Sequence, residues 1–152
     1  MGFRDIQGLV FAEAVAPQVI KDNAAWTATA IDTAGAEYVT IICHIGATDI
    51  AMAALKIQEC ATSGGSYTDI TGASADGTTI DGTTGTLPSA TDDNKFVVFE
   101  ISKTNRKRYF KVSATAGDGT VGTYLSAVAI LSPTNVNGYS STTKGCLSVI
   151  RV

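Results

Sequence analysis

The stretch Glu37–Ala73, EYVTIICHIGATDIAMAALKIQECATSGGSYTDITGA, decides the fold class of this chain. Apolar residues recur at every second position along 36–45 and 51–60, and this period is typical of β-strands. The short turn between the two segments predicts a hairpin, and a Gly-Ser corner then leads to a third short strand. One apolar face of this predicted hairpin is expected to point inward: Val39, Ile41, Cys43, Ile45, Leu55 and Ile57.

The rest of the chain repeats this pattern at short intervals. After Trp26 no segment has the 3.6-residue periodicity of a helix, and clusters of Gly, Asp, Asn and Thr separate the apolar runs. A second hairpin is predicted from 95–102 and 107–115, with the inward residues Val97, Phe99, Ile101, Phe110 and Val112. The predicted strands are 24–32, 36–45, 51–60, 66–70, 77–81, 95–102, 107–115, 122–132 and 145–152.

These strands predict an all-β chain with an extended N-terminal arm, 1–23, and a single domain, 24–152. Two four-stranded halves indicate an antiparallel β-sandwich of about eight or nine strands, jelly-roll or Greek-key like. Within the arm, Leu9–Ala16 fits one or two helical turns as well as an extended segment, because Pro17 would end any helix there.

The composition narrows the classes of partner. Charged residues make up only 16% of the 152 residues, and the net charge is -3. Nucleic-acid binding draws on clustered positive charge, so we expect no nucleic-acid partner. We expect no signal peptide and no membrane partner, since no apolar run is long enough to span a bilayer. The 3 cysteines have no CxxC spacing, which favours a reducing compartment over a disulfide framework.

Several predicted strands are apolar on their outer faces as well. Opposite the inward rows lie Tyr38, Thr40, Ile42 and His44 in one strand and Phe96 and Val98 in another, and 122–132 is apolar on both faces. A strand with one face in water should alternate more cleanly. We therefore expect some outer faces to be covered by a loop, by the N-terminal arm or by a neighbouring subunit.

The reactive side chains do not combine into a catalytic or metal site. The only histidine, His44, follows Cys43, and neighbours on a strand point to opposite sides of the sheet. The two cannot share one zinc ion from a regular strand, and Cys60 and Cys146 are expected to be partly buried. A catalytic triad would have to use His44, and no GxSxG motif is present. We therefore expect no enzyme activity, no metal and no cofactor.

Two loop features invite a functional interpretation. Asp76, Asp81, Asp92 and Asp93 lie among Gly, Thr and Ser, so we expect solvated acids rather than paired catalytic carboxylates. A calcium site built from them stays open, although the EF-hand spacing is absent. Gly117–Gly122 matches GxGxxG, but a strand follows it instead of a helix, which predicts a hairpin turn rather than a phosphate loop.

Basic residues concentrate at the beginning of one predicted strand: Lys103, Arg106, Lys107, Arg108 and Lys111. Strand alternation places Arg106 and Arg108 on one face and Lys107, Tyr109 and Lys111 on the other. Two interpretations stand. The segment is either a solvated edge strand that discourages aggregation or an ionic contact for an acidic partner surface.

A series of short segments adds a family resemblance: Pro17–Ile20, Ala30–Gly35, Val39–Ile41, Ile45–Ala47, Leu55–Glu59, Gly65–Ile70, Lys107–Val112 and Ser126–Leu131. In this order and spacing the chain resembles, over residues 17–132, a group of tailed-bacteriophage and prophage structural proteins of about this length, often encoded in the head-gene region. The segments 1–16 and 133–152 depart from the group.

The resemblance implies a small β-sandwich that decorates or cements the capsid where hexamers of the major capsid protein meet, as a homotrimer. We therefore expect a non-enzymatic, head-stabilising protein, made in the bacterial host cytoplasm and located on the virion. The alternatives are a phage tail, fibre or head-fibre component, and a carbohydrate-binding sandwich that uses Tyr67, Tyr124 or Tyr139. From the physics of the residues, partner contacts are expected at Phe3, Arg4, Phe11, Tyr38, Ile42, His44, Arg106, Lys107, Arg108, Tyr109 and Lys111.

Overall fold

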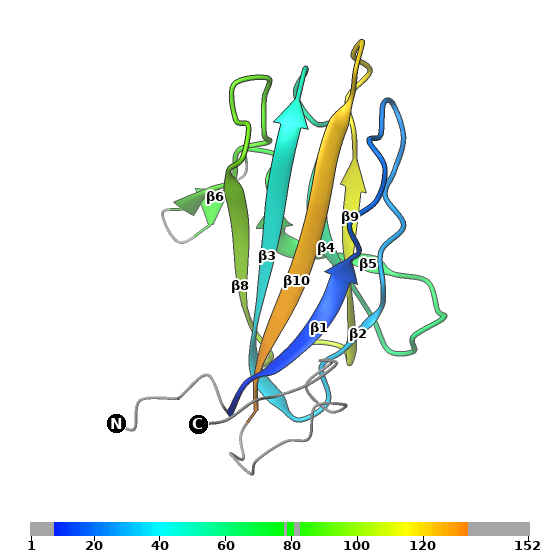
Figure 1. Cartoon of the computed structure of the whole chain (residues 1–152). Coiled ribbons are helices and arrows are strands. Elements are labelled where there is room, and N and C mark those ends of the chain that lie inside the picture. Colours follow the sequence, from blue (N-terminus) through cyan, green and yellow to red (C-terminus); the bar gives the residue numbers. More distant parts are fainter. Residues whose placement is uncertain (1–7, 78, 81–82, 134–152) are drawn as a thin grey trace, which may run out of the picture.

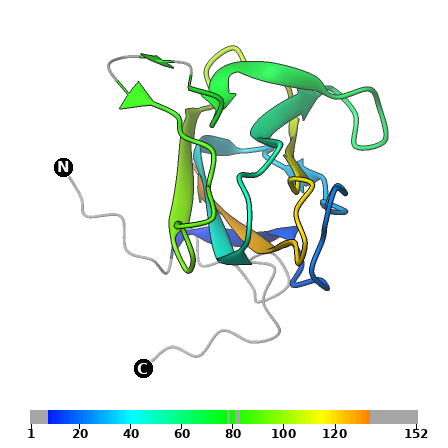
Figure 2. The ribbon, with the colours of Figure 1, turned by 90° about the horizontal axis from the view of Figure 1, so that it is seen from above.

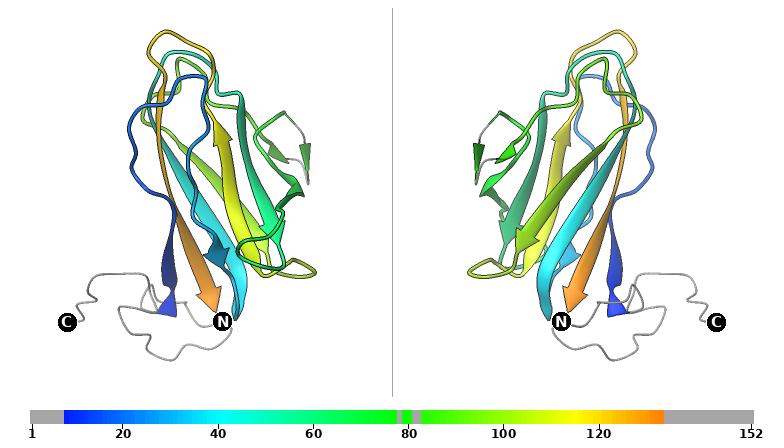
Figure 3. Two further views of the ribbon diagram at one scale, coloured as in Figure 1. Left: turned by 90° about the vertical axis from the view of Figure 1, so that its right-hand side faces the viewer. Right: turned by 90° about the vertical axis from the view of Figure 1, so that its left-hand side faces the viewer.

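Two four-stranded antiparallel sheets, packed face to face, form the body of the molecule (Figures 1 and 3). The structure is a computed structural model and describes residues 8–77, 79–80 and 83–133. The first sheet has the order β1-β10-β3-β8 and the second β2-β9-β4-β5. This arrangement confirms the predicted antiparallel β-sandwich. The strands are β1 (Val10–Val15), β2 (Ile31–Asp32), β3 (Ala36–Thr48), β4 (Ala54–Cys60), β5 (Thr68–Ser74), β6 (Thr79–Ile80), β7 (Thr83–Thr84), β8 (Phe96–Ser102), β9 (Tyr109–Thr115) and β10 (Thr123–Pro133).

The strand pairs are nested along the sequence, so that the chain resembles one long hairpin folded at its middle. β4 pairs with β5, β3 with β8, β2 with β9 and β1 with β10, all antiparallel. Rolling this long hairpin up brings β10 beside β3 and β9 beside β4, which closes the two sheets. Eight strands wound in this way form a jelly roll. β6 and β7 make a small separate ribbon within the β5–β8 connection.

The core lies between the inner faces of the two sheets, whose ribbons Figure 2 shows from above. The predicted inward row of β3 is fully buried, and Leu55, Ile57, Phe110 and Val112 of the second sheet are at most 2% exposed. Phe99 and Ile101 of β8 are buried as well, while Val97 is partly buried against the core. The alternation of the sequence therefore assigned the inner faces correctly.

The two predicted hairpins are wrong in their pairing. β3 belongs to the first sheet and β4 to the second, and the same separation divides β8 from β9. The inward rows of each predicted hairpin therefore meet across the core instead of lying side by side. The Asp-Gly segment 117–122 is not a hairpin turn either, because it crosses from β9 in the second sheet to β10 in the first.

The N-terminal third also differs from expectation. The predicted arm, 1–23, is extended at Val10–Val15, but there it is the edge strand β1 of the first sheet, so the domain begins before residue 24. Of the predicted strand 24–32 only Ile31–Asp32 is a strand, with one isolated bridge between Ala25 and Thr115. The predicted strand 145–152 lies outside the described residues.

Candidate interaction surfaces

The outer face of the first sheet is unusually apolar for a surface. We call it the apolar face and define it by the outward side chains Phe11, Tyr38, Ile42, His44, Phe96, Val98, Val128 and Ile130. Phe96 is 62% exposed, Tyr38 53% and Val98 49%, whereas Val39 and Phe99, which follow Tyr38 and Val98 in their strands, are buried in the core. A sheet with one solvated face normally carries polar residues there. The first sheet therefore carries apolar side chains on its outer side as well, next to polar ones such as Thr40 and Glu100.

Strand register brings these side chains together in rows across the sheet. Val128 of β10, Ile42 of β3 and Val98 of β8 are direct cross-strand neighbours. In the next row His44 lies opposite Phe96, and their rings stack with centroids 4.6 Å apart and an interplanar angle of 26°. Residues that share one face at this spacing pack against one another. Val128, Ile42, Val98, His44 and Phe96 thus form a continuous patch, and the row of Thr40 and Glu100 lies between this patch and Tyr38.

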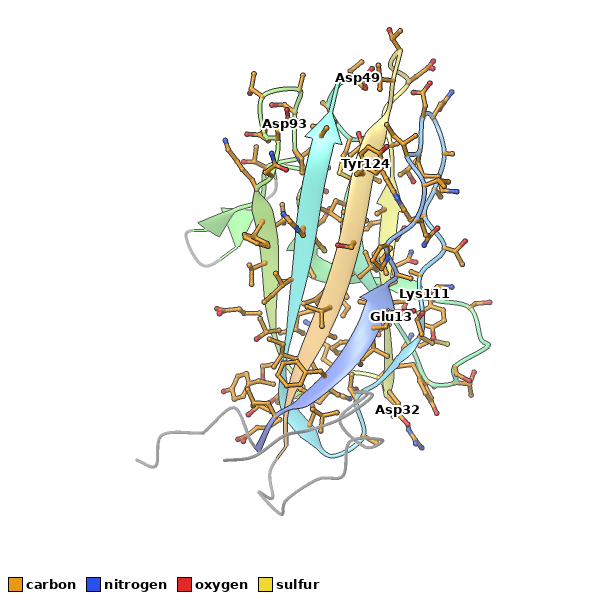
Figure 4. The ribbon with its side chains drawn as sticks, in the orientation of Figure 1. Glu13, Asp32, Asp49, Asp93, Lys111 and Tyr124 are labelled. Carbon is orange, nitrogen blue, oxygen red and sulfur yellow. The ribbon has the colours of Figure 1, made fainter. Side chains whose placement is uncertain are left out.

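A shallow hollow of about 470 Å³ lies in the middle of the apolar face. Its walls come from β1, β3, β8 and β10, and include Phe11, Ile42, His44, Phe96 and Val128. Glu13, which Figure 4 labels on β1, supplies the one carboxylate of its lining. The hollow can therefore receive an apolar side chain of a partner, with His44 and Glu13 as polar contacts.

The predicted basic contacts lie on a different part of the molecule. Arg106, Lys107 and Arg108 lie in the connection just before β9, and Tyr109 and Lys111 lie in β9 itself. β9 is flanked by β2 and β4, so the segment is not the solvated edge strand that one interpretation required. Figure 4 shows Asp32 and Lys111 on the side of the molecule away from β8. The predicted contact residues therefore divide between two surfaces: Phe11, Tyr38, Ile42 and His44 on the first sheet, and Arg106, Lys107, Arg108, Tyr109 and Lys111 on the second. Phe3 and Arg4 lie outside the described residues.

Most of these basic side chains have partners within the chain. Arg108 forms a bidentate pair with Asp32, at 2.9 and 2.7 Å, and this guanidinium lowers the pKa of the Asp32 carboxyl. Arg106 lies 3.8 Å from Glu59, and Lys107 Nζ donates to Thr68 Oγ1. Lys111 sits over the ring of Tyr67. The two carboxylates, Asp32 and Glu59, offset part of the positive charge that is available to an acidic partner.

Cys43 and His44 point to opposite sides of β3, as strand alternation predicts. Cys43 is fully buried in the core, and this burial raises the pKa of its thiol to about 12. A thiol with such a pKa is not ionised at neutral pH and is a poor nucleophile. His44 instead faces outward on the apolar face. Cys43 therefore belongs to the core, and His44 belongs to the outer face of the first sheet.

The GxGxxG segment binds an anion, but that anion belongs to the chain itself. The Asp49 carboxylate accepts hydrogen bonds from the backbone N–H groups of Thr120 and Val121, both at 2.6 Å, and of Gly122 at 3.0 Å. Asp22 accepts another from Gly119. Successive N–H groups in this arrangement form an anion-binding nest. Here Asp49 fills the nest, which fastens the 117–122 loop to the end of β3 (Figure 4).

We expect the hydrogen bonds between Asp49 and the 117–122 loop to make the stability of the fold depend on pH. Its loop hydrogen bonds lower the pKa of Asp49 below the value in the unfolded chain, about 3.9. The stabilisation is therefore complete above that pH and is lost as the pH falls through the lower, folded-state pKa. In urea denaturation, Asp49→Asn should unfold more easily than wild type at neutral pH, and the difference should narrow below about pH 4. The control is Asp118→Asn, in the same loop, which should match wild type throughout.

The loop acids are held by local polar contacts. Asp92 accepts hydrogen bonds from Lys95 and from both N–H and Oγ of Ser89, and these partners lower the pKa of its carboxyl. Asp93 accepts one from the backbone N–H of Thr48. Among the described residues no three His, Cys, Asp or Glu side chains come close enough to hold a metal ion, and Asp81 lies outside them.

The list of predicted contacts omitted Phe96, Val98 and Val128, three of the most exposed apolar residues of the apolar face. The signal that could have found them is present in the sequence, because each alternates with buried neighbours. In the described part of the chain no helix has the length and hydropathy to cross a membrane. Neither a family model nor a curated protein sequence matches this chain.

Proposed function

We propose that this chain is a non-enzymatic structural protein that binds the outside of an assembled tailed-phage capsid at capsomer junctions and stabilises the shell. The observation that carries the proposal is the apolar face, which leaves aromatic and aliphatic side chains in water on the outer side of the first sheet. Exposed apolar patches of this kind mark surfaces that bind other proteins. The resemblance over residues 17–132 supplies the identity of the partner, the major capsid protein.

Binding to the assembled shell would stabilise it by mass action. A ligand that binds one state only shifts the equilibrium toward that state, and each apolar Å² removed from water contributes about 25 cal/mol. A homotrimer presents three such surfaces and multiplies a modest affinity at each one. The proposed complex therefore needs neither a cofactor nor a reaction.

The carbohydrate-binding alternative has less support from the side chains. A sugar platform needs an open aromatic face, but Lys111 covers the ring of Tyr67, whose hydroxyl donates to the carbonyl of Ser63. Trp26 is only 5% exposed. Tyr124 is exposed at the end of β10, and Tyr139 lies outside the described residues. Nothing in these contacts favours a tail or fibre component over a capsid-bound protein.

Sedimentation with capsid shells tests the proposal. Wild-type protein should pellet with expanded shells of the phage or prophage that encodes it, and not with unexpanded shells. Phe96→Ala should bind at least about tenfold more weakly, because exposed aromatic anchors dominate interface energies. The matched control is Val19→Ala, which truncates an apolar residue 74% exposed but outside the apolar face and should bind like wild type.

Three results would contradict the proposal: no binding to expanded shells, equal binding to both kinds of shell, or full binding by Phe96→Ala. Native mass spectrometry of the free protein tests the homotrimer separately. Circular dichroism of each variant verifies that weaker binding does not reflect unfolding.

A further inference from the structure

The four outer edges of the two sheets are not equally protected. β1 has a register shift between Glu13 and Val15, and β5 pairs with β4 through another irregularity. β2 is only two residues long. Bulges and short strands are the usual means of preventing a further strand from adding to an edge. β8 has neither, since it runs in unbroken register with β3 from Phe96 to Ser102.

The direction of the β8 backbone groups follows from two hydrogen bonds at its ends. Ile45 N–H donates to the carbonyl of Lys95, and Lys103 N–H donates to the carbonyl of Glu37, so odd-numbered residues address β3. Backbone groups alternate in direction along a strand. The N–H and C=O groups of Phe96, Val98, Glu100 and Ser102 therefore point to the open edge. That edge can accept a complete antiparallel ladder.

The open edge borders a groove of about 900 Å³ between β8 and β5, on the side that faces the viewer in the right panel of Figure 3. Ile70, Ala73, Phe99 and Ile101 contribute apolar side chains to its lining. On the other side of the same edge lies the apolar face, with Phe96 and Val98. A strand added to β8 would therefore meet apolar surface on both of its faces.

A strand in that position needs apolar residues on both faces, and residues 145–152, GCLSVIRV, have them. On one face of an extended strand they carry Cys146, Ile150 and Val152, and on the other Leu147 and Val149. Most strands with one solvated face are apolar on one side only. The segment follows β10 in the chain and lies outside the described residues.

The end of β10 is also well placed. Ser132 of β10 and Ser102 of β8 both lie opposite Tyr38, on its two sides, so β10 and β8 end about 10 Å apart. The segment 134–144 can span up to about 36 Å. A strand that returns from this end of the sandwich runs antiparallel to β8, because β8 runs toward it. The short separation favours the chain's own segment over that of another copy, since a tether gives an effective concentration of about millimolar.

We propose that residues 145–152 add to the open edge of β8 in the same molecule as a fifth strand of the first sheet. This strand covers the β8–β5 groove and widens the apolar face. The proposal concerns the free protein and does not depend on any capsid.

Hydrogen exchange measured by NMR on the full chain tests the added strand. The amides of Val98 and Glu100 should be protected, and in the Val149→Pro variant they should exchange at least about tenfold faster, because proline cannot donate to the ladder and disrupts the pairing. The amides of Val97, Phe99 and Ile101, which address β3, are the internal control and should stay unchanged. Thr143→Pro, in the connecting segment, is the matched control variant.

Two outcomes would overturn the proposal. In the first, Val98 and Glu100 exchange rapidly in wild type or at the same rate in Val149→Pro. In the second, their protection disappears on dilution together with an oligomer seen by light scattering, which would assign the strand to a neighbouring copy. If the protein is a monomer, protection of Val98 and Glu100 that does not change with protein concentration supports the proposal. If it is an oligomer, wild-type subunits are mixed with Val149→Pro subunits, and protection of the wild-type amides that persists at every dilution supports it.

Discussion

Replacing Phe110 by alanine should lower the free energy of unfolding by about 3–5 kcal/mol, the range for removing a large aromatic side chain from a protein core. Phe110 of β9 is 0% exposed and is among the largest fully buried side chains of the described residues. It pairs with Ile31 of β2 and with Glu59 of β4, so it lies between two strands of the second sheet. Backbone pairing to strands on both sides limits how far the surroundings can relax into the space.

The matched control is the same truncation on the surface. Phe96 is 62% exposed on the apolar face, so Phe96→Ala should change the free energy of unfolding by no more than about 0.5 kcal/mol. Urea denaturation measures the free energy of unfolding of both variants, and the comparison holds when the dependence of that free energy on urea concentration is the same for both. A difference between the two variants below about 1 kcal/mol would show that the inner faces are assigned incorrectly.

The second large effect is expected at Gly122, where the chain enters β10. Its backbone has φ +98°, a conformation that side chains with a Cβ rarely adopt. A Cβ there would clash with the carbonyl oxygen of Lys21, whose N–H and C=O both bond to Thr123. Gly122→Ala should therefore cost about 3 kcal/mol or more, from backbone strain and from the displacement of this bridge.

Gly35→Ala separates the two contributions. Gly35 also has a positive φ, +76°, but a Cβ there would meet nothing within 4 Å. Its variant should lose only about 1–2 kcal/mol, the cost of the left-handed conformation alone. Urea denaturation of both glycine variants at neutral pH measures the two losses of unfolding free energy. Equal losses at the two glycines would show that the contact with Lys21 contributes nothing.

The sequence predicted which side chains face inward far better than which strands pair. The alternation of β3 and β4 identified both buried rows, because alternation reports the two faces of a strand. It carries no information on the neighbour that a strand's backbone edges meet. Segments joined by a short turn normally form a hairpin, yet the 49–53 connection carries the chain from one sheet to the other. Only the complete set of eight strands decides that pairing.

For the candidate surfaces too, the sequence indicated which side chains face outward but not which neighbours they meet. The outward positions of Tyr38, Ile42 and His44 follow from alternation, and the structure joins them to Phe96, Val98 and Val128 through cross-strand register. The interpretation of the basic segment required its neighbours, Asp32 and Glu59, which are distant in sequence. The same is true of Asp49, whose acceptance of three loop N–H groups no local motif indicates.

The nested pairing of the jelly roll also determines how the chain must be made. The innermost pair, β4 and β5, is local, but β1 finds its partner only when β10 exists, with Val10 opposite Leu131. During synthesis from the N-terminus, β1, β2 and β3 therefore leave the ribosome before their partners in β8, β9 and β10. Contacts this distant in sequence form slowly, and unpaired apolar strands aggregate. A nascent chain that pauses before residue 123 would expose the buried row of β3, so we expect such pauses to lower the yield of folded protein.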